Sequence, residues 1–152
     1  MHVARDHLAD IRALDARMKY IGAQIAALVA ASGTGLTGLF GIGPVIAGRI
    51  LAEVGDVARF PTKDAFASYN GTAPIEASSG PKVRHRLNPR GNRQLNHALH
   101  IAAIVQLRHD GPGRAYYQRK IEEGKTPKEA IRALKRRISD AVYKKLRNDI
   151  RS

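Results

Sequence analysis

The stretch LFGIGPVIAGRILAEVGD, residues 39–56, decides the fold of this chain of 152 residues. Its GIG triplet, residues 41–43, is followed directly by Pro44 and then by mostly apolar residues. Proline suits the first position of a helix, because its missing N–H would have no partner there. Glycine adopts positive φ readily and lets another backbone come close. The pattern therefore predicts a tight turn followed by an apolar helix from Pro44 to about Val54.

This turn and the helix after it resemble a helix-hairpin-helix motif. In that motif, N–H groups of the hairpin and of the following helix hold a DNA phosphate without reading the base sequence. On this interpretation the DNA contacts come from Gly41, Ile42, Gly43 and Arg49. The alternative is a plain turn between two core helices, and the basic Arg49 downstream favours the DNA interpretation.

The residues before this stretch, from His2 to about Ala31, predict one long helix. Its apolar residues follow the 3, 4, 3, 4, 3 spacing of a coiled coil: Ile11, Leu14, Met18, Ile21, Ile25 and Leu28. Pairing with another chain, as a homodimer or higher oligomer, and packing on the same domain both fit this pattern. Three glycines between residues 32 and 38 predict a hinge. We therefore expect a dimerisation helix at 1–31, a hinge at 32–38 and a compact helical domain at 39–152.

Downstream, local signals predict four more helices. They are expected at residues 62–69, 90–109 and 114–123, and after Thr126. Thr126 and Glu129 have the spacing of a capping box, and Lys135 is expected among partly solvated charges. The alternation in KVRHRL, residues 82–87, predicts a short strand or extended arm. The fold class is therefore mainly α, with a coiled-coil-like N-terminal helix and a compact helical domain that includes a helix-hairpin-helix and a basic, partly extended loop.

The composition narrows the class of protein. The net charge of +13 favours a polyanionic partner, with nucleic acid first and an anionic membrane surface second. The absence of cysteine excludes disulfides and thiolate zinc sites. Carboxylates are scattered, and His97 and His100 are interpreted as solvated or DNA-facing, so we expect no metal and no cofactor in this chain. No apolar run reaches the length of a membrane span, and we expect a cytoplasmic, nucleoid-associated protein.

The candidate chemistry lies in APIEASSGPKVRHRLNPRGNRQL, residues 73–95. No acidic residue occurs between Ala77 and His109. A serine hydroxyl in such a cationic field could attack a phosphodiester, because arginines neutralise the non-bridging oxygens and favour the alkoxide. The serines are Ser78 and Ser79, and the DNA-binding candidates are Lys82, Arg84, Arg86, Arg90 and Arg93. The alternative is a basic clamp whose serines only hydrogen-bond phosphates.

The order of these features resembles the C-terminal domain of the IS-one-ten, IS-one-sixteen and IS-nine-oh-two transposases, which are related to Piv-type DNA invertases. The resemblance covers about residues 36–146. The matching positions, in order, are Gly41-Ile42-Gly43-Pro44, Glu53, Gly55-Asp56, Phe60, Gly71, Pro74, Ser79-Gly80, Gly91-Asn92 and Leu95. The chain departs from the family pattern at Phe40, Thr72, Pro89 and Asn96, where proline, leucine, lysine and arginine are usual.

The resemblance implies strand exchange through a covalent phosphoserine link to DNA. It implies Ser79 as the nucleophile, Ser78 as the fallback, and Arg84, Arg86, Arg90 and Arg93 as phosphate ligands. It also implies a RuvC-like N-terminal domain with carboxylate-bound Mg²⁺ and a guiding bridge RNA. This chain shows no such carboxylate set, so we expect it to be the C-terminal portion, able to bind DNA but inactive without that domain. Two other classes are a non-catalytic nucleic-acid-binding module and a protein that binds structured RNA or the ribosome.

Overall fold

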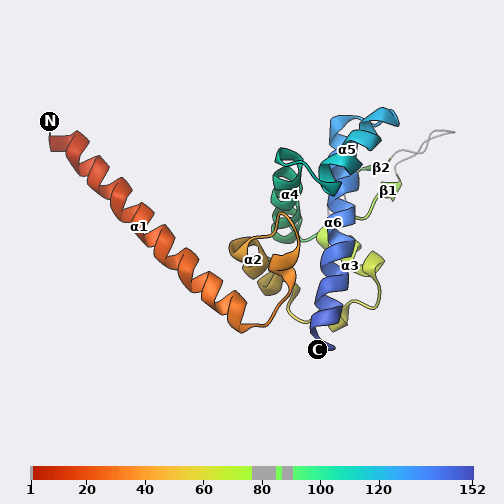
Figure 1. Cartoon of the computed structure of the whole chain (residues 1–152), viewed down its shortest axis with the longest axis horizontal. Coiled ribbons are helices and arrows are strands. Elements are labelled where there is room, and N and C mark those ends of the chain that lie inside the picture. The colour runs from red at the N-terminus through yellow and green to blue at the C-terminus, as the bar shows by residue number, and fades with distance from the viewer. Residues whose placement is uncertain (1, 77–84, 87–90) are drawn as a thin grey trace.

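The computed structural model describes residues 2–76, 85–86 and 91–152, and these form a mainly α structure (Figure 1). The fold class is therefore as predicted. The helices are α1 (His2–Ala31), η1 (Leu36–Gly38), α2 (Pro44–Val54), η2 (Val57–Arg59), α3 (Lys63–Asn70), α4 (Arg93–Arg108), α5 (Pro112–Glu122) and α6 (Pro127–Asp149), of which η1 and η2 are 3₁₀ turns. Two short strands, β1 (Ile75–Glu76) and β2 (His85–Arg86), pair antiparallel, with Ile75 opposite Arg86. No helix in the described ranges has both the length and the apolarity to cross a bilayer.

Local signals set most of the helix ends. Helix α2 has the predicted bounds, with Pro44 in its first turn. The Thr62 hydroxyl accepts a hydrogen bond from the Ala65 N–H at 3.1 Å and caps α3, which Gly71 ends at φ 75°. The predicted capping box of Thr126 and Glu129 is present at the start of α6. These ends depend on short-range hydrogen bonds, and the sequence predicts them for that reason.

Helix α3 begins one residue later than predicted, at Lys63, and the starts of α4 and α5 differ from the prediction by more. Helix α4 begins at Arg93, because the side chain of Asn92 accepts a hydrogen bond from the Leu95 N–H at 2.9 Å and caps the helix. Helix α5 begins earlier, at Pro112, since proline fits the first helical turn.

The core lies between α2, α3, α4 and α6. Its largest fully buried side chains include Leu36, Ile50, Phe66, Leu99 and Leu134. Helix α4 contacts both α2 and α6, and the face that it buries includes Ala98, Ala102 and Ala103. Small side chains let neighbouring helices approach closely, so α4 is the central helix of the domain.

Helix α1 extends away from this body (Figure 1). It contacts α2, and near its C-terminal end a Cβ on Gly48 would lie 3.0 Å from Ile25 Cγ2 and 3.4 Å from Val29 Cγ2. Toward the N-terminus the predicted apolar row is exposed, and Met18 is 70% exposed. This chain therefore leaves most of the row uncovered.

The glycine-rich segment after α1 is held against the end of α6. The Asp149 carboxylate accepts hydrogen bonds from the Thr34 hydroxyl at 2.9 Å and the Gly35 N–H at 3.0 Å. Leu36 follows and is fully buried. These contacts fix the course of residues 34–36, while the division into units 1–31, 32–38 and 39–152 stays a prediction.

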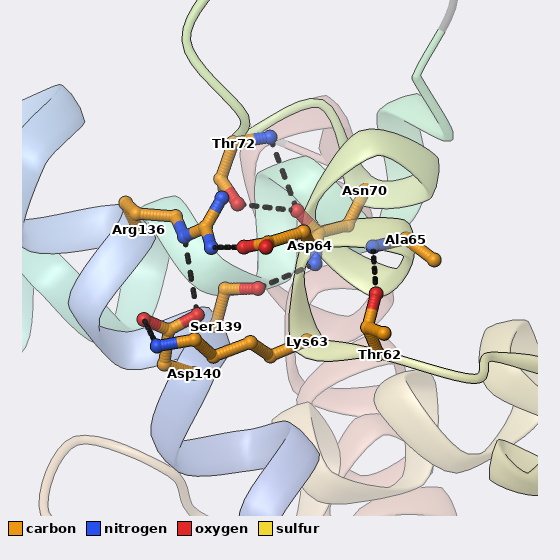
Figure 2. A network of polar contacts seen from close by, with 9 residues as sticks. All are labelled: Thr62, Lys63, Asp64, Ala65, Asn70, Thr72, Arg136, Ser139 and Asp140. Carbon is orange, nitrogen blue, oxygen red and sulfur yellow. Dashed lines mark hydrogen bonds and ion pairs between the residues drawn. The ribbon is translucent and has the colours of Figure 1, made fainter.

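A polar network joins α3 to α6 (Figure 2). The Asn70 amide donates to the Ser139 hydroxyl at 2.7 Å, and both side chains are fully buried. The Asn70 carbonyl oxygen Oδ1 accepts from the N–H and the hydroxyl of Thr72, at 3.1 and 2.6 Å. Arg136 pairs with Asp64 and Asp140 on the same face. The network therefore fixes the turn in which the chain leaves α3 toward β1.

Lys135 extends this network to α4, and its position corrects the expectation of a solvated charge. The side chain is only 7% exposed, and its Nζ donates to Asn96 Oδ1 at 2.6 Å. The Asn96 amide in turn donates to the Asn70 carbonyl at 2.9 Å. Burial lowers the pKa of Lys135, and the nearby charge of Arg132 lowers it further. Asn96, one of the departures from the family pattern, thus accepts a hydrogen bond from a buried ammonium group.

The burial of Lys135 predicts a specific pH dependence of stability. The lowered pKa means that the unfolded chain binds more protons than the folded chain between neutral pH and the ordinary lysine pKa of about 10.4. The free energy of unfolding of the wild type, relative to Lys135→Met, is therefore expected to rise as the pH increases from 7 to 10. Urea titrations across that range measure the difference.

Lys128→Met is the matched control, because Lys128 is an exposed lysine of the same helix. It is expected to leave the difference between wild type and variant flat. A flat difference for Lys135→Met as well would contradict the burial of a charged lysine.

Candidate nucleic-acid interface

The two serines and most of the basic residues near them lie outside the described residues. This applies to Ser78, Ser79, Lys82, Arg84 and Arg90. Arg86 is placed by its backbone in β2. The part of the candidate interface that the structure describes is the segments that flank this stretch. The roles of Ser78, Ser79 and the basic residues near them stay predictions.

Two glycines bring the ends of the serine-containing stretch together. A Cβ on Gly91 would lie 2.5 Å from the Gly71 Cα and 2.6 Å from the Gly71 nitrogen. The Asn92 N–H donates to the Tyr69 carbonyl at 2.6 Å beside this contact. The β1–β2 pair continues from the same place. The contact between Gly71 and Gly91 therefore brings the two ends of the serine-containing stretch together, and we call this contact and the hydrogen bond beside it the closed base.

Asn92 is the residue that holds this base. Its amide donates to Glu53 Oε2 at 2.8 Å and to the Tyr69 hydroxyl oxygen at 3.1 Å, while its carbonyl oxygen caps α4. The Tyr69 hydroxyl donates to the Glu53 backbone carbonyl at 3.2 Å. One side chain thus ties the end of α2, the end of α3 and the start of α4 to each other.

Arg59 completes the base from the side of α2. Its guanidinium carbon lies 4.6 Å from the ring centroids of both Phe60 and Tyr69, and its Nε donates to the Val54 carbonyl at 3.0 Å. This arrangement stabilises the C-terminal end of α2. Several positions that carry the family resemblance, among them Glu53, Phe60 and Asn92, therefore build the base.

Two of the predicted phosphate ligands meet at the first turn of α4. The Arg49 Nη1 reaches across from α2 and donates to Gln94 Oε1 at 3.3 Å. Arg93 is the neighbour of Gln94 and begins the same helix, and all three side chains are exposed. The described part of the interface is therefore the first turn of α4 with Arg49 beside it, next to the closed base.

Two histidines lie further along the same helix. His97 is exposed and His100 is half-buried. Burial lowers the pKa of His100, and the positive charges of Lys135 and His97 add to the effect. In the described ranges, no three His, Asp or Glu side chains gather where a metal ion could bind.

The GIG triplet lies at the other end of α4. Gly41 has φ 88°, and a Cβ there would lie 2.7 Å from the Ala102 carbonyl oxygen. Ala102 follows Gln94 by eight residues, or about 12 Å along the helix. Ile42 is 3% exposed and belongs to the core, while Gly43 is exposed and caps α2. The backbone that comes close to Gly41 is that of α4, and the structure does not bring the triplet to Arg49.

The element before the triplet is the 3₁₀ turn η1, where a helix-hairpin-helix motif has an α-helix. A cavity of about 490 Å³ adjoins the turn and is lined by residues 37–43, Ile46, Ile101 and Val105. None of these lining residues is basic, and the lining suits apolar side chains better than a phosphate. The helix-hairpin-helix interpretation stays a prediction.

The closed base generates a stability prediction. Gly91→Ala places a methyl group against the backbone of Gly71, which cannot rotate away. We expect the free energy of unfolding to fall by roughly 1–3 kcal/mol or more, as in other overpacked cores, and urea unfolding measures it. Gly38→Ala is the control, because a Cβ there meets no atom within 4 Å, and we expect a change within about 0.5 kcal/mol. Equal unfolding midpoints for the two variants would show that the base is open in solution.

Comparisons with known proteins identify the family of this chain. Residues 34–118 match the Transposase IS116/IS110/IS902 family. The 43.6 kDa protein of insertion element IS110 from Streptomyces coelicolor is 35% identical over 92% of this chain and 35% of its own length. The 42 kDa protein of insertion element IS900 from Mycobacterium paratuberculosis is 36% identical over 71% of this chain and 28% of its own length.

A pilin gene-inverting protein of Moraxella bovis is also similar, at 28% identity over 72% of this chain and 35% of its own length. The chain thus spans about a third of the length of these relatives. The family match includes the GIG turn, the closed base and the stretch that carries the two serines. The chain belongs to the Transposase IS116/IS110/IS902 family.

Proposed function

We propose that this chain is the C-terminal, DNA-binding and strand-exchange portion of a transposase, with Ser79 as the nucleophile. The observation that carries the proposal is the closed base at Gly71 and Gly91. It joins the two ends of the serine-containing stretch close to the first turn of α4, where Arg49 and Arg93 offer positive charge. Family membership and the name of the pilin gene-inverting relative support rearrangement of DNA as the outcome.

In the proposed reaction the Ser79 hydroxyl oxygen attacks a DNA phosphorus atom and loses its proton. A phosphoserine bond forms as one bridging P–O bond breaks, and the DNA keeps a free hydroxyl at the cut. A hydroxyl of a second strand then attacks the phosphoserine, which rejoins DNA and restores the serine. Lys82, Arg84, Arg86, Arg90, Arg93 and Arg49 would hold phosphates and neutralise the charge that develops on the oxygens.

This sequence of steps conserves the number of phosphodiester bonds, so it needs no nucleotide cofactor. Bound Mg²⁺ and a guide RNA belong, in this proposal, with the RuvC-like domain of a longer protein.

Trapping of the covalent intermediate tests the proposal. In the full-length protein, DNA that carries the cleavage site is expected to give a protein–DNA adduct on a denaturing gel. Ser79→Ala is expected to abolish the adduct, because it removes the attacking oxygen, while Ser78→Ala keeps it. Ser152→Ala, at the exposed C-terminal end, is the control.

Loss of the adduct in Ser78→Ala alone would move the nucleophile to Ser78. Adducts in both variants would mean that neither serine attacks DNA and that this chain is a binding module. The chain without the RuvC-like domain is expected to bind DNA and join no ends.

We also propose that α1 pairs with α1 of a second copy. The row of Ile11, Leu14 and Met18 is exposed along the part of α1 that leaves the body (Figure 1). An apolar row at a/d spacing is stable in water when a second helix covers it. The proposed assembly is a homodimer or a higher oligomer built on this helix.

The pairing of α1 gives a direct test by sedimentation velocity. Leu14→Glu with Met18→Glu places two charges in the apolar row, and we expect the oligomer to dissociate to monomers. Ala16→Glu with Ala23→Glu adds the same charge on the opposite side of the helix and is expected to keep the oligomer. A monomeric wild type, or identical behaviour of the two variants, would refute the pairing.

A further inference from the structure

We propose that the outer face of α6 is a second surface for duplex DNA, distinct from the first turn of α4. The surface consists of Arg137, Lys144 and Arg147 of α6 and of Arg151, which follows the end of the helix, and we call these four residues the α6 outer row. Arg137, Lys144 and Arg151 are exposed, and Arg147 is half-buried. It extends the proposed function, because it takes the same ligand on a different helix.

The spacing of the row places its cations along one side of the helix. Seven residues separate Arg137 from Lys144 and Lys144 from Arg151. Ten residues separate Arg137 from Arg147, the last of these cations inside α6, so the helical part of the row is about 15 Å long. One DNA strand advances about 3.4 Å per nucleotide, and this part of the row therefore matches the length of about four base pairs.

The acidic side chains of α6 are engaged elsewhere. Glu129 belongs to the capping box at the start of the helix. Asp140 pairs with Arg136 and with Lys63, as Figure 2 shows. Asp149 accepts its hydrogen bonds from Thr34 and Gly35. Among the described residues, the cations of the α6 outer row form no ion pair, so their charge is available to a polyanion.

The other polyanion considered, an anionic membrane, fits this face poorly. A helix that lies in a membrane interface inserts an apolar face between the lipids. In α6 that face is occupied, because Leu134, Ile138, Val142 and Leu146 are buried in the core. What α6 leaves outside is mainly charge, and the exposed apolar residues beside the row are only Ala141 and Ile150 among the described residues, which suits phosphates in water better than a lipid interface.

The aromatic ring beside the row favours the backbone of a duplex over unstacked bases. Proteins that bind single strands stack bases on open aromatic rings. The Tyr116 ring is surrounded by cations, with Arg137 at 4.8 Å, Arg119 at 5.3 Å and Lys120 at 5.4 Å from its centroid. The ring therefore holds Arg137 of the α6 outer row in place, and the contact that its guanidinium offers is to a phosphate.

The α6 outer row lies on a different helix from the first proposed DNA surface, which is the first turn of α4 with Arg49 beside it. Helix α4 packs against α2 on one side and against α6 on another. Arg49 and Arg93 lie on α2 and α4, whereas the α6 outer row faces away from the core. Two duplexes held on one domain are what an exchange of strands between two DNA molecules requires.

The salt dependence of binding tests the surface. Fluorescence anisotropy of this chain with a labelled 20-base-pair duplex gives the slope of log K against log salt concentration. Each lost phosphate contact lowers that slope by about 0.9. The triple variant Arg137→Gln, Lys144→Gln and Arg147→Gln is expected to lower it by about 2 to 3, with an unchanged circular dichroism spectrum.

The matched control removes three cations that already have acidic partners. It is Lys63→Gln, Arg114→Gln and Lys120→Gln, whose partners are Asp140, Asp110 and Glu123. The net charge falls by the same amount, and we expect less than half of the effect. Equal slopes for the two triple variants would overturn the proposal, because binding would then follow net charge alone.

Two further arms separate the proposals. Arg49→Gln with Arg93→Gln probes the first turn of α4, so a loss confined to this variant would keep the proposed function and overturn the α6 surface. A loss confined to the α6 variant would keep the α6 surface and count against the first turn of α4. Binding of the α6 outer row to phosphatidylserine vesicles with no effect on duplex DNA would overturn the proposal in favour of a membrane.

Discussion

The contact between the backbones of Gly71 and Gly91 is the constraint on which the candidate interface depends. A side chain at position 91 has no room, since its Cβ would lie 2.5 Å from the Gly71 Cα. Asn92 follows and fastens this contact to Glu53 and Tyr69. The two ends of the stretch with the two serines are therefore held together, and this junction is fastened to the ends of α2 and α3.

The second constraint is electrostatic. In a folded chain with net charge +13 the positive charges repel one another, and carboxylates that lie beside cations reduce this repulsion. Here Asp140 pairs with Arg136, and Asp149 accepts a hydrogen bond from the segment after α1. Most of the remaining positive charge is left at the surface. Cations are thereby left at the first turn of α4 and along the outside of α6, which are the two faces that we propose for phosphates.

What the sequence predicts well is local. Pro44 at the start of α2 and the capping box at Thr126 act within one helical turn, and the structure has both. The roles of Lys135 and Asn92 depend on partners 39 residues away, Asn96 and Glu53 respectively, and no local pattern reports such a contact. Lys135 does fall on the apolar side of its helix, and that is the signal that could have indicated burial. The roles of the two serines stay predictions, because the described residues end on either side of them.

The hydrogen bonds from Thr34 and Gly35 to Asp149 have a mechanical consequence. They fasten the root of α1 to the last turn of α6, and the fully buried Leu36 anchors the same point. A rotation of the far end of α1 is therefore expected to be transmitted to α6, because the segment between the two helices is fixed and does not absorb it. The long helix is therefore expected to move together with α6, through the contacts of the Asp149 carboxylate and of Leu36.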